Sequence, residues 1–269
     1  MSASDGPTAD PAFVRRSEEA FLASWPSVAT VLDGAWLIRL SPGWPTNGRA
    51  NAVTILDRAD GARAEARLDA AAALYARYDQ PLAVRVTPLT PPAVVEVLDD
   101  RGLAPRKASL ALSGPLPDDA AGAAEGLILE EAAPGAPSQA WLDTVQGTAE
   151  PGRREAFAAM MRACPRPTLF ARIARNGRAL AALSATVHHG LAVIENVVTH
   201  PEARRQGLAR ALLGHAGAWA RVRGADRLFL FVEADNAPAR AFYAAAGLAE
   251  THRYHYRGPV PGVMQGALS

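Results

Sequence analysis

Cysteine is almost absent from this sequence: Cys164 is the only one among 269 residues. A single cysteine excludes an intramolecular disulfide and any metal site built from several cysteines. Cys164 stands between Ala163 and Pro165, and we interpret it as a buried packing residue, not as a nucleophile. His188 and His189 are interpreted as part of a turn and not as a ligand pair, so we expect no metal in this protein.

An excess of one charge is also missing, because 28 Lys and Arg balance 27 Asp and Glu and leave a formal charge of +1. Nucleic-acid-binding proteins usually carry a basic excess, so we expect no nucleic-acid partner. Apolar runs such as residues 70–76 and 228–232 are far too short to span a bilayer. The polar, acidic stretch Met1–Pro11 does not resemble a signal peptide. The sequence therefore predicts a soluble, cytoplasmic protein without a membrane partner.

Length and composition indicate a folded protein of about two domains. At ~150 residues per domain the chain corresponds to about 1.8 domains, and 49% apolar with 20% charged residues is a globular composition. Between Ser113 and Gly126 the composition shifts to Pro, Gly, Asp and Ala, which predicts a linker or a long exposed loop. A second Pro/Gly stretch, residues 134–137, is interpreted as a loop. We place the boundary near residue 120, which gives domains 1–120 and 121–269.

Periodicity in the C-terminal half predicts an alternation of strands and helices. The predicted strands are residues 127–129, 169–175, 180–188, 191–199, 227–232 and 252–256. The predicted helices are residues 139–146, 153–162, 207–222 and 237–246. Meandering strands followed by a β-α-β unit predict a mixed α/β (α+β) fold, in which helices cover both faces of the sheet.

The N-terminal half repeats this pattern at a fixed offset of 145 residues. Residues 51–54 (N-A-V-T) align with residues 196–199 (N-V-V-T), and residues 102–104 (G-L-A) align with residues 247–249 (G-L-A). A helix and a strand between these two matches keep the same register without a gap. Few copies and a long period favour duplicated domains over a solenoid, so we predict two copies of one fold.

The most informative segment is a strand that runs into a basic loop and then into a helix. The strand ends at Thr199, the loop carries Arg204 and Arg205, and the first helical turn holds Gly207 and Ala209. Free backbone N–H groups and the positive end of the helix dipole form an anion site at such a helix start. Small residues let a diphosphate approach the backbone closely, so we predict a phosphate-binding loop here.

Two motifs in the C-terminal half resemble those of the GNAT N-acetyltransferase superfamily. Arg204, Gly207 and Ala209 occupy the three places of its Q/R-x-x-G-x-G/A signature. Residues 236–248 resemble its N-x-x-A-x-x-F-Y-x-x-x-G-F segment, with Leu248 in place of the last phenylalanine. The two motifs occur in the family's order and at its spacing.

The resemblance covers residues 127–257 and extends to one subgroup of the family. The stretch V-E-A-D-N at residues 232–236 is similar to the C-terminal domain of mycothiol synthases, which are tandem GNAT proteins. The resemblance therefore implies a tandem GNAT protein whose C-terminal domain is active.

The same resemblance implies that acetyl-CoA is the cosubstrate. Its diphosphate would bind the backbone of the loop and the helix start, and its pantetheine arm would pair with the preceding strand. A backbone N–H near Val198 would stabilise the thioester oxygen, and Asn236 would cap the next helix, bind the pantetheine, or do both. The implied cofactor-binding residues are Val197, Val198, Thr199, Arg204, Arg205, Gln206, Gly207, Leu208, Ala209 and Asn236.

Glu195 and Tyr243 are the implied catalytic residues. Glu195, on the strand that leads to the loop, is the candidate base for the incoming ammonium; its alternatives are binding of that ammonium and a structural ion pair. Glu233 is the next candidate for the base. Tyr243 occupies the family's general-acid position and would protonate the departing thiolate, with a packing role as its alternative. The amine attacks the thioester directly, so no covalent enzyme intermediate is needed.

The N-terminal copy lacks these groups at the aligned positions. In place of the acid, the base, the helix cap and the loop glycine stand Leu98, Ala50, Pro91 and Ala62. We therefore predict a degenerate GNAT copy that binds no acetyl-CoA productively but shapes the acceptor pocket. Its candidate acceptor contacts, for each of which a structural role is the alternative, are Trp36, Arg39, Arg49 and Asn51.

The sequence as a whole predicts an acetyl-CoA-dependent N-acetyltransferase that acts on the primary amine of a small molecule. Acetylation of a protein or peptide N-terminus is one alternative, and a non-catalytic acyl-CoA-sensing module is another. The retained Tyr243 argues against a sensor, because a pure binder needs no acid. Acetyl-CoA and an amine acceptor are the expected partners of a monomer or a homodimer.

Overall fold

The computed structural model describes residues 9–117, 125–132, 136–147 and 149–258. The N-terminal half contains, in chain order, α1 (Pro11–Ser24), β1 (Ala29–Asp33), β2 (Trp36–Leu40), β3 (Val53–Ile55), α2 (Ala64–Ala76), β4 (Val84–Val86), α3 (Pro92–Asp100) and β5 (Arg106–Pro115). The C-terminal half contains β6 (Leu127–Ala132), α4 (Gln139–Gln146), α5 (Pro151–Arg162), β7 (Thr168–Arg175), β8 (Arg178–His188), β9 (Leu191–Thr199), the short 3-10 helix η1 (Pro201–Ala203), α6 (Leu208–Arg221), β10 (Arg227–Glu233), α7 (Ala237–Ala245) and β11 (Ala249–Arg257).

Local sequence determines where several helices begin. Asp10 precedes α1, and its carboxylate accepts a hydrogen bond from the N–H of Ala12 at 3.0 Å. Asn236 precedes α7 in the same way, and its side-chain oxygen accepts from the N–H of Ala239 at 3.1 Å. Each cap satisfies a backbone N–H that has no partner inside the helix.

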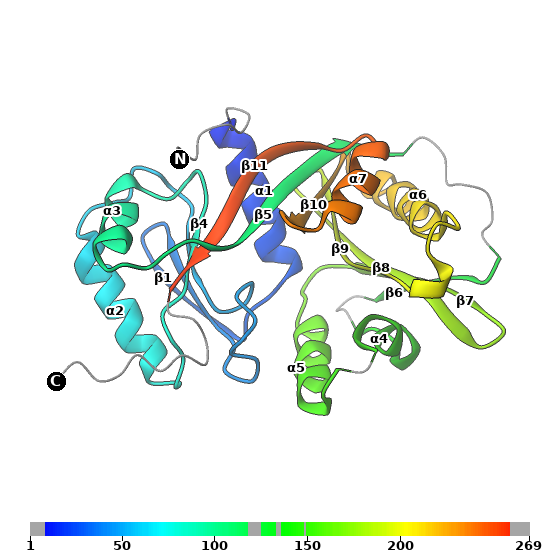
Figure 1. Cartoon of the computed structure of the whole chain (residues 1–269), viewed down its shortest axis with the longest axis horizontal. Coiled ribbons are helices and arrows are strands. Elements are labelled where there is room, and N and C mark those ends of the chain that lie inside the picture. The colour runs from blue at the N-terminus through cyan, green and yellow to red at the C-terminus, as the bar shows by residue number, and fades with distance from the viewer. Residues whose placement is uncertain (1–8, 118–124, 133–135, 148, 259–269) are drawn as a thin grey trace.

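The strands of the described residues form one mixed sheet in the order β1-β2-β3-β4-β11-β5-β10-β9-β8-β7-β6. The last strand of each half pairs with a strand of the other half: β5 is antiparallel to β10, and β11 is antiparallel to β4. Figure 1 shows β5 and β11 side by side as they cross from one half to the other. The halves therefore exchange their final strands, and the sheet runs through both without a break.

The two halves also share one order of elements. Three strands are followed by helix, strand, helix and strand, first as β1-β2-β3-α2-β4-α3-β5 and then as β7-β8-β9-α6-β10-α7-β11. Each half has one parallel pair, β3 with β4 and β9 with β10. Helices α3 and α7 begin at Pro92 and Ala237, which are 145 residues apart, the offset that the sequence predicts.

Helices cover both faces of the C-terminal part of the sheet. Helices α6 and α7 pack on one face through side chains such as Leu212 and Tyr243. Helices α1, α4 and α5 contribute Phe21, Trp141 and Phe157 to the core on the opposite face, and α1 lies against β8 and β9 although it begins the N-terminal half. The predicted mixed α/β fold is confirmed.

The predicted start of the linker is wrong. Residues 113–115 belong to β5 and pair with residues 227–229 of β10. A Cβ atom at Gly114 would lie 2.5 Å from the carbonyl oxygen of Gly247, so this glycine permits close backbone packing and marks no flexible segment. Composition misleads here because pairing with a distant strand decides the structure. Residues 118–124 of the predicted linker, and 134–135 of the second Pro/Gly stretch, lie outside the described residues.

Two kinds of feature are missing from the part of the chain that the structure describes. None of its helices is long and apolar enough to cross a membrane. None of its clusters of His, Cys, Asp and Glu has three members placed to hold a metal ion. Cys164 is buried and unpaired, as predicted.

Candidate active site

The parallel strands β9 and β10 separate part-way along their length. They pair only over Leu191–Val193 and Arg227–Phe229. Beyond this point β9 continues beside β8, and β10 continues beside β5, so within the described sheet the rest of the β9 edge toward β10 has no strand partner. A cavity of about 300 Å³ lies at the separation, lined by side chains of β9, β10 and α7. We call it the splay cavity.

A β-bulge at Asn196 shapes the β9 wall of the splay cavity. Ser184 of β8 pairs with Glu195 of β9, and Ala182 pairs with Val198. Two residues of β8 thus stand opposite three residues of β9, so β9 has one extra residue. Asn196 adopts the left-handed conformation, with φ of +57°, which Asn tolerates better than most residues. Its side-chain amide donates to the Ser184 hydroxyl at 2.8 Å. The extra residue changes the direction of neighbouring side chains, and Val197, Val198 and Thr199 follow it as half-buried residues.

Glu195 lines the splay cavity from β9 and is only 9% exposed. Burial raises the pKa of its carboxyl group to about 7, although the guanidinium groups of Arg49 and Arg39 lower it. The Arg49 Nη1 atom lies 3.6 Å from Glu195 Oε1. A carboxyl group with a pKa near neutrality is suited to general base catalysis at physiological pH. The contact with Arg49 is also an ion pair, the alternative that the sequence left open.

Tyr243 lines the same cavity from α7. The side chain is buried, and burial raises the pKa of its hydroxyl to about 12. The hydroxyl therefore stays protonated at neutral pH and is available as a proton donor. Asn236 also lines this cavity while its side chain caps α7. The fold thus brings the predicted acid, the predicted base and the predicted cap to one cavity.

The loop between β9 and α6 presents free backbone N–H groups. Gly207 precedes α6 with φ of +74°, and Arg205 also has a positive φ, +61°. The N–H groups of residues 206–209 donate to no backbone carbonyl outside α6 among the described residues, as expected at a helix start. Arg204, Arg205 and Gln206 are exposed, whereas the Leu208 side chain is buried and leaves only its backbone for a ligand. The loop has the geometry of an anion site.

A second cavity, of about 430 Å³, adjoins the splay cavity. Arg49, Asn196 and Glu233 line both, so the two spaces meet at these side chains. The walls of the larger cavity come from both halves of the chain, including the loop that carries Trp44 in one half and Phe157 of α5 in the other. We call it the inter-half cavity.

Comparison with known proteins finds a family match within the C-terminal half. The sequence profile of the acetyltransferase (GNAT) family matches residues 138–248, a stretch that contains the separating strands, the anion-binding loop, Glu195 and Tyr243. Residues 138–248 are thus similar to the GNAT family. This similarity supports acetyl transfer from acetyl-CoA, and we call residues 138–248 the GNAT segment.

Similarity to other proteins extends well beyond the GNAT segment. The uncharacterized N-acetyltransferase YobR of Bacillus subtilis (strain 168) is 23% identical over 249 residues, which cover 91% of this chain and 98% of that protein. A GCN5-related N-acetyltransferase from Kribbella flavida has a TM-score of 0.66 and 19% identity, covering 95% of this chain and 97% of its own. A tandem GNAT protein from the clavulanic acid biosynthesis pathway has a TM-score of 0.60 and 16% identity over 98% of both chains. The fold of nearly the whole chain is therefore that of such proteins.

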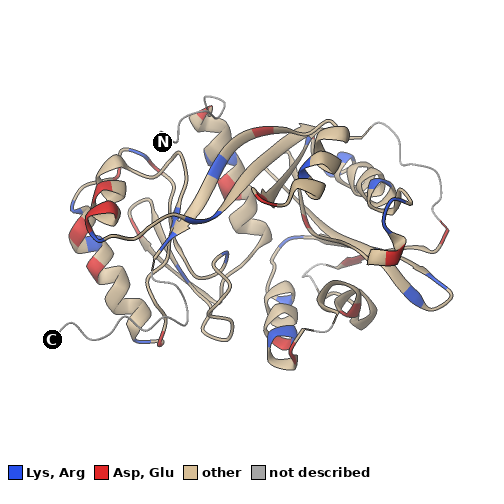
Figure 2. Cartoon of the chain, viewed as in Figure 1, with Lys and Arg blue, Asp and Glu red and all other residues tan. Residues whose placement is uncertain are grey.

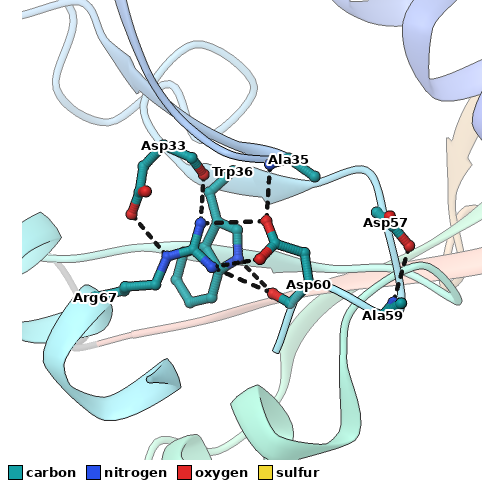
Figure 3. A network of polar contacts seen from close by, with 7 residues as sticks. All are labelled: Asp33, Ala35, Trp36, Asp57, Ala59, Asp60 and Arg67. Atoms are coloured by element: carbon teal, nitrogen blue, oxygen red, sulfur yellow. Dashed lines mark hydrogen bonds and ion pairs between the residues drawn. The ribbon is translucent and has the colours of Figure 1, made fainter. Parts of the chain in front are cut away.

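The N-terminal loop that precedes α2 differs from the loop that precedes α6. Its Asp60 carboxylate accepts from the N–H of Ala35 at 2.8 Å and pairs with Arg67 at 2.7 Å (Figure 3). Arg63 precedes α2 in the left-handed conformation, at the place where Gly207 precedes α6. The two loops therefore differ both in the residue at the helix start and in the presence of a paired carboxylate.

Trp36 and Arg39 are not acceptor contacts. Trp36 is fully buried, and its indole N–H donates to the carbonyl oxygen of Asp60 at 2.9 Å (Figure 3). Arg39 is buried and donates to the carbonyl oxygens of Trp25 and Arg49. Neither side chain lines the splay cavity or the inter-half cavity. The prediction of an acceptor contact is wrong for both, because Trp36 packs in the core beneath β2 and Arg39 is enclosed by the backbone carbonyls that it binds.

Arg49 and Asn51 do line the inter-half cavity. The Asn51 amide is already used within its loop, where it donates to the carbonyl oxygens of Trp44 at 2.9 Å and Asn47 at 3.0 Å. Sequence reasoning missed Gln80 and Arg106 in the same cavity. They belong to no motif, so only the fold brings them to the site.

Proposed function

We propose that this protein is an acetyl-CoA-dependent N-acetyltransferase that acts on the primary amine of a small molecule. The observation that carries the proposal is the meeting of Glu195 and Tyr243 in the splay cavity, which opens into the inter-half cavity. A base and an acid thus share the space where an amine can reach a thioester. The pKa of Glu195, raised to about 7, and that of Tyr243, raised to about 12, suit these two roles.

The residues present fit acetyl-CoA. The free N–H groups at the start of α6, together with Arg204 and Arg205, favour a diphosphate. The free edge of β9 at Val197–Thr199 offers backbone partners to the amides of a pantetheine arm. When bound, acetyl-CoA supplies the activated acetyl group.

Glu195 and Tyr243 then move the two protons that the transfer requires. Glu195 accepts a proton from the ammonium of the acceptor, directly or through water, so that the nitrogen can bond to the thioester carbon. Tyr243 donates its hydroxyl proton to the sulfur as the carbon–sulfur bond breaks, and the second proton that the nitrogen loses on becoming an amide restores the Tyr243 hydroxyl. A backbone N–H near Val198 stabilises the carbonyl oxygen. Positioning of the two reactants supplies much of the rate.

We propose that the chain is a tandem of two GNAT folds, 1–120 and 121–269, of which the second is active. The shared order of elements and the 145-residue spacing of α3 and α7 support the duplication. Asp60 in the N-terminal loop and Leu98 at the place of the acid support the loss of function in the first copy. Strand β5 of the first copy pairs with β10 of the second. The boundary at residue 120 therefore separates the two copies in the sequence, although their strands pair across it.

A small acceptor fits the inter-half cavity better than a protein does. About 430 Å³ is within the usual range of small-molecule sites. The walls come from several separate parts of the chain, including the loop at Trp44 and the start of β5 at Arg106. These walls restrict the approach of a folded chain to Glu195.

Gly207→Glu is expected to weaken binding of acetyl-CoA at least tenfold. A Cβ atom at Gly207 meets no atom within 4 Å, so the new side chain has room, but its charge repels the diphosphate. Gly207→Gln is the matched control, because it carries the same backbone strain without the charge. Calorimetric titration of both variants with acetyl-CoA measures the difference. Equal affinities for the two variants would show that the diphosphate binds elsewhere.

Tyr243→Phe tests the proposed function itself. We expect kcat to fall by about 10²-fold or more, the magnitude of general acid catalysis, with little change in the Kd of acetyl-CoA, because phenylalanine preserves the packing. Thiol release from acetyl-CoA over amino acids, polyamines, amino sugars and peptides with free N-termini provides the assay. An unchanged kcat would remove Tyr243 from the reaction. Release with peptides alone would favour N-terminal acetylation, and binding without release on any amine would favour an acyl-CoA sensor.

A further inference from the structure

The inter-half cavity carries an excess of positive charge. Four of its lining side chains are basic, Arg49, Arg106, Lys107 and Arg153, and only one, Glu233, is acidic. Figure 2 shows a basic segment at the start of β5, which runs beside the end of β11. The chain as a whole is nearly neutral, so the excess belongs to the cavity and not to the protein.

Two of the four basic side chains already have partners. Arg49 lies beside Glu195 and over the Trp25 ring, 5.1 Å from its centroid, and Arg153 lies 5.7 Å from the Trp44 centroid. Arg106 and Lys107 form no ion pair within the part of the chain that the structure describes.

Arg106 is the strongest sign of an anion site. Its Nε atom is buried without a hydrogen-bond partner among the described residues. Burial lowers the pKa of its guanidinium, and no carboxylate offsets that effect; only Tyr256 opposes it. Arg106 is half-buried, and a partly desolvated cation without a counter-charge is unfavourable, so a site for an anion is the simplest reason to keep it.

Gln80 points to the same end of the cavity. Its side chain is 5% exposed, yet neither its amide nitrogen nor its amide oxygen has a hydrogen-bond partner among the described residues. Native proteins rarely leave such atoms unsatisfied. Gln80 precedes β4, which pairs with the end of β11, and Tyr256 of β11 stands opposite Arg106.

The distance from this end to the amine position limits the length of the acceptor. Ser109 of β5 stands opposite Glu233, and Glu233 lines the junction of the two cavities. Arg106 is three residues from Ser109 along β5, which corresponds to about 10 Å of strand, less at the bulge. An acceptor that spans the cavity has its second recognised group up to about 10 Å from its amine.

We infer that the acceptor carries an oxyanion, a carboxylate or a phosphate, which Arg106, Lys107 and Gln80 bind while its amine faces Glu195. The acceptor is thus a small zwitterion of the amino-acid or amino-phosphate class. This inference rests on the proposed acetyl transfer for the amine end but not for the anion end. The anion site and the acetyl transfer can therefore be tested, and can fail, independently.

Binding to the CoA-saturated protein tests the anion end, because CoA occupies the anion-binding loop and removes it from competition. The probes are 6-aminohexanoate, 6-aminohexanamide and phosphoethanolamine, measured by calorimetry. We expect the carboxylate or the phosphate to bind at least tenfold more tightly than the amide. Arg106→Gln should remove that preference, Arg106→Lys should keep part of it, and Arg101→Gln, which alters a surface pair with Asp69, should leave it intact. Equal binding of amide and anions by the wild type, or an unchanged preference in Arg106→Gln, would overturn the inference.

Gln80→Leu separates a ligand contact from a structural role. Removing an unsatisfied buried amide should leave Tm unchanged or raise it, while the anions bind several-fold more weakly. A fall in Tm without loss of anion binding would assign Gln80 to the fold. The ratio of kcat/KM for ω-amino acids and their amides gives the activity arm. If ω-amino acids and their amides are acetylated at equal rates, the anion site is overturned and the proposed acetyl transfer still holds. If the anions bind preferentially but no amine is acetylated, the anion site holds and the proposed acetyl transfer is overturned.

Discussion

Glu195→Gln is expected to lower kcat/KM by about 10²- to 10⁴-fold at pH 8, the range of general base catalysis. Glutamine keeps the size of the side chain and its place on β9 but cannot take a proton. The wild type should lose activity as the pH falls through about 7, because burial raises the pKa of Glu195 to about 7 and the protonated carboxyl group is no base. The variant should lack this acidic limb. A pH profile of kcat/KM for both proteins measures the effect.

Arg49 supplies the control for this assignment. Its guanidinium, 3.6 Å from Glu195, lowers the pKa of that carboxyl group. Arg49→Gln should therefore raise the pKa and move the acidic limb to higher pH without abolishing it. If the acidic limb of the kcat/KM profile stays in place in Arg49→Gln, or persists in Glu195→Gln, then Glu195 is not the base. The base would then be Glu233 or a water chain.

Glu18→Gln is expected to lower the free energy of unfolding by about 3–5 kcal/mol, the usual effect of breaking a buried ion pair. Glu18 of α1 pairs with Arg85 of β4, and its Oε1 atom lies 3.3 Å from His252 Nε2 of β11. All three side chains are almost completely buried. The variant leaves the Arg85 charge inside the protein without a counter-charge. Urea denaturation at pH 7 measures the loss.

The pH dependence of stability gives a second readout. Burial raises the pKa of Glu18, but Arg85 and His252 lower it more, so its net value is below the ordinary one. The ionised carboxylate therefore stabilises the fold above the ordinary pKa, and this contribution is lost as the pH falls through the lowered pKa. The stabilities of the wild type and Glu18→Gln should converge at acidic pH.

Glu19→Gln is the matched control on the same helix. Glu19 is partly exposed and pairs with Arg15 at the surface, so its replacement should change stability by less than about 1 kcal/mol. Equal losses for Glu18→Gln and Glu19→Gln would show that the buried network does not hold α1, β4 and β11 together. In the double variant Glu18→Leu/Arg85→Met, much of the stability should return, because neither charge is then buried unpaired.

The elements of the GNAT segment could be predicted because their signals are local. The helix 139–146 and the strand 191–199 have the predicted bounds, since side-chain periodicity and the cap at Ser138 act within a few residues. The loop before α6 could be predicted for the same reason. The left-handed turn at Gly207 and the helix start after it lie in one short stretch.

The exchange of β5 and β11 could not be predicted in this way. Both strands have ordinary strand patterns, and nothing in them specifies a partner in the other half. The bulge at Asn196 was missed as well, because the regular alternation of a strand gives no warning of an extra residue.

The sequence by itself determined the mixed fold, the repeat at 145 residues, and the loop and helix at Gly207, because each is written in neighbouring residues or in a fixed spacing. Only the tertiary structure decided that Arg49 meets Glu195 and that Arg106 and Gln80 face the inter-half cavity. It also decided that Trp36 and Arg39 serve the core. Contacts of this kind join residues far apart in the chain. They depend on which strands pair and which faces are buried, which is a property of the whole fold.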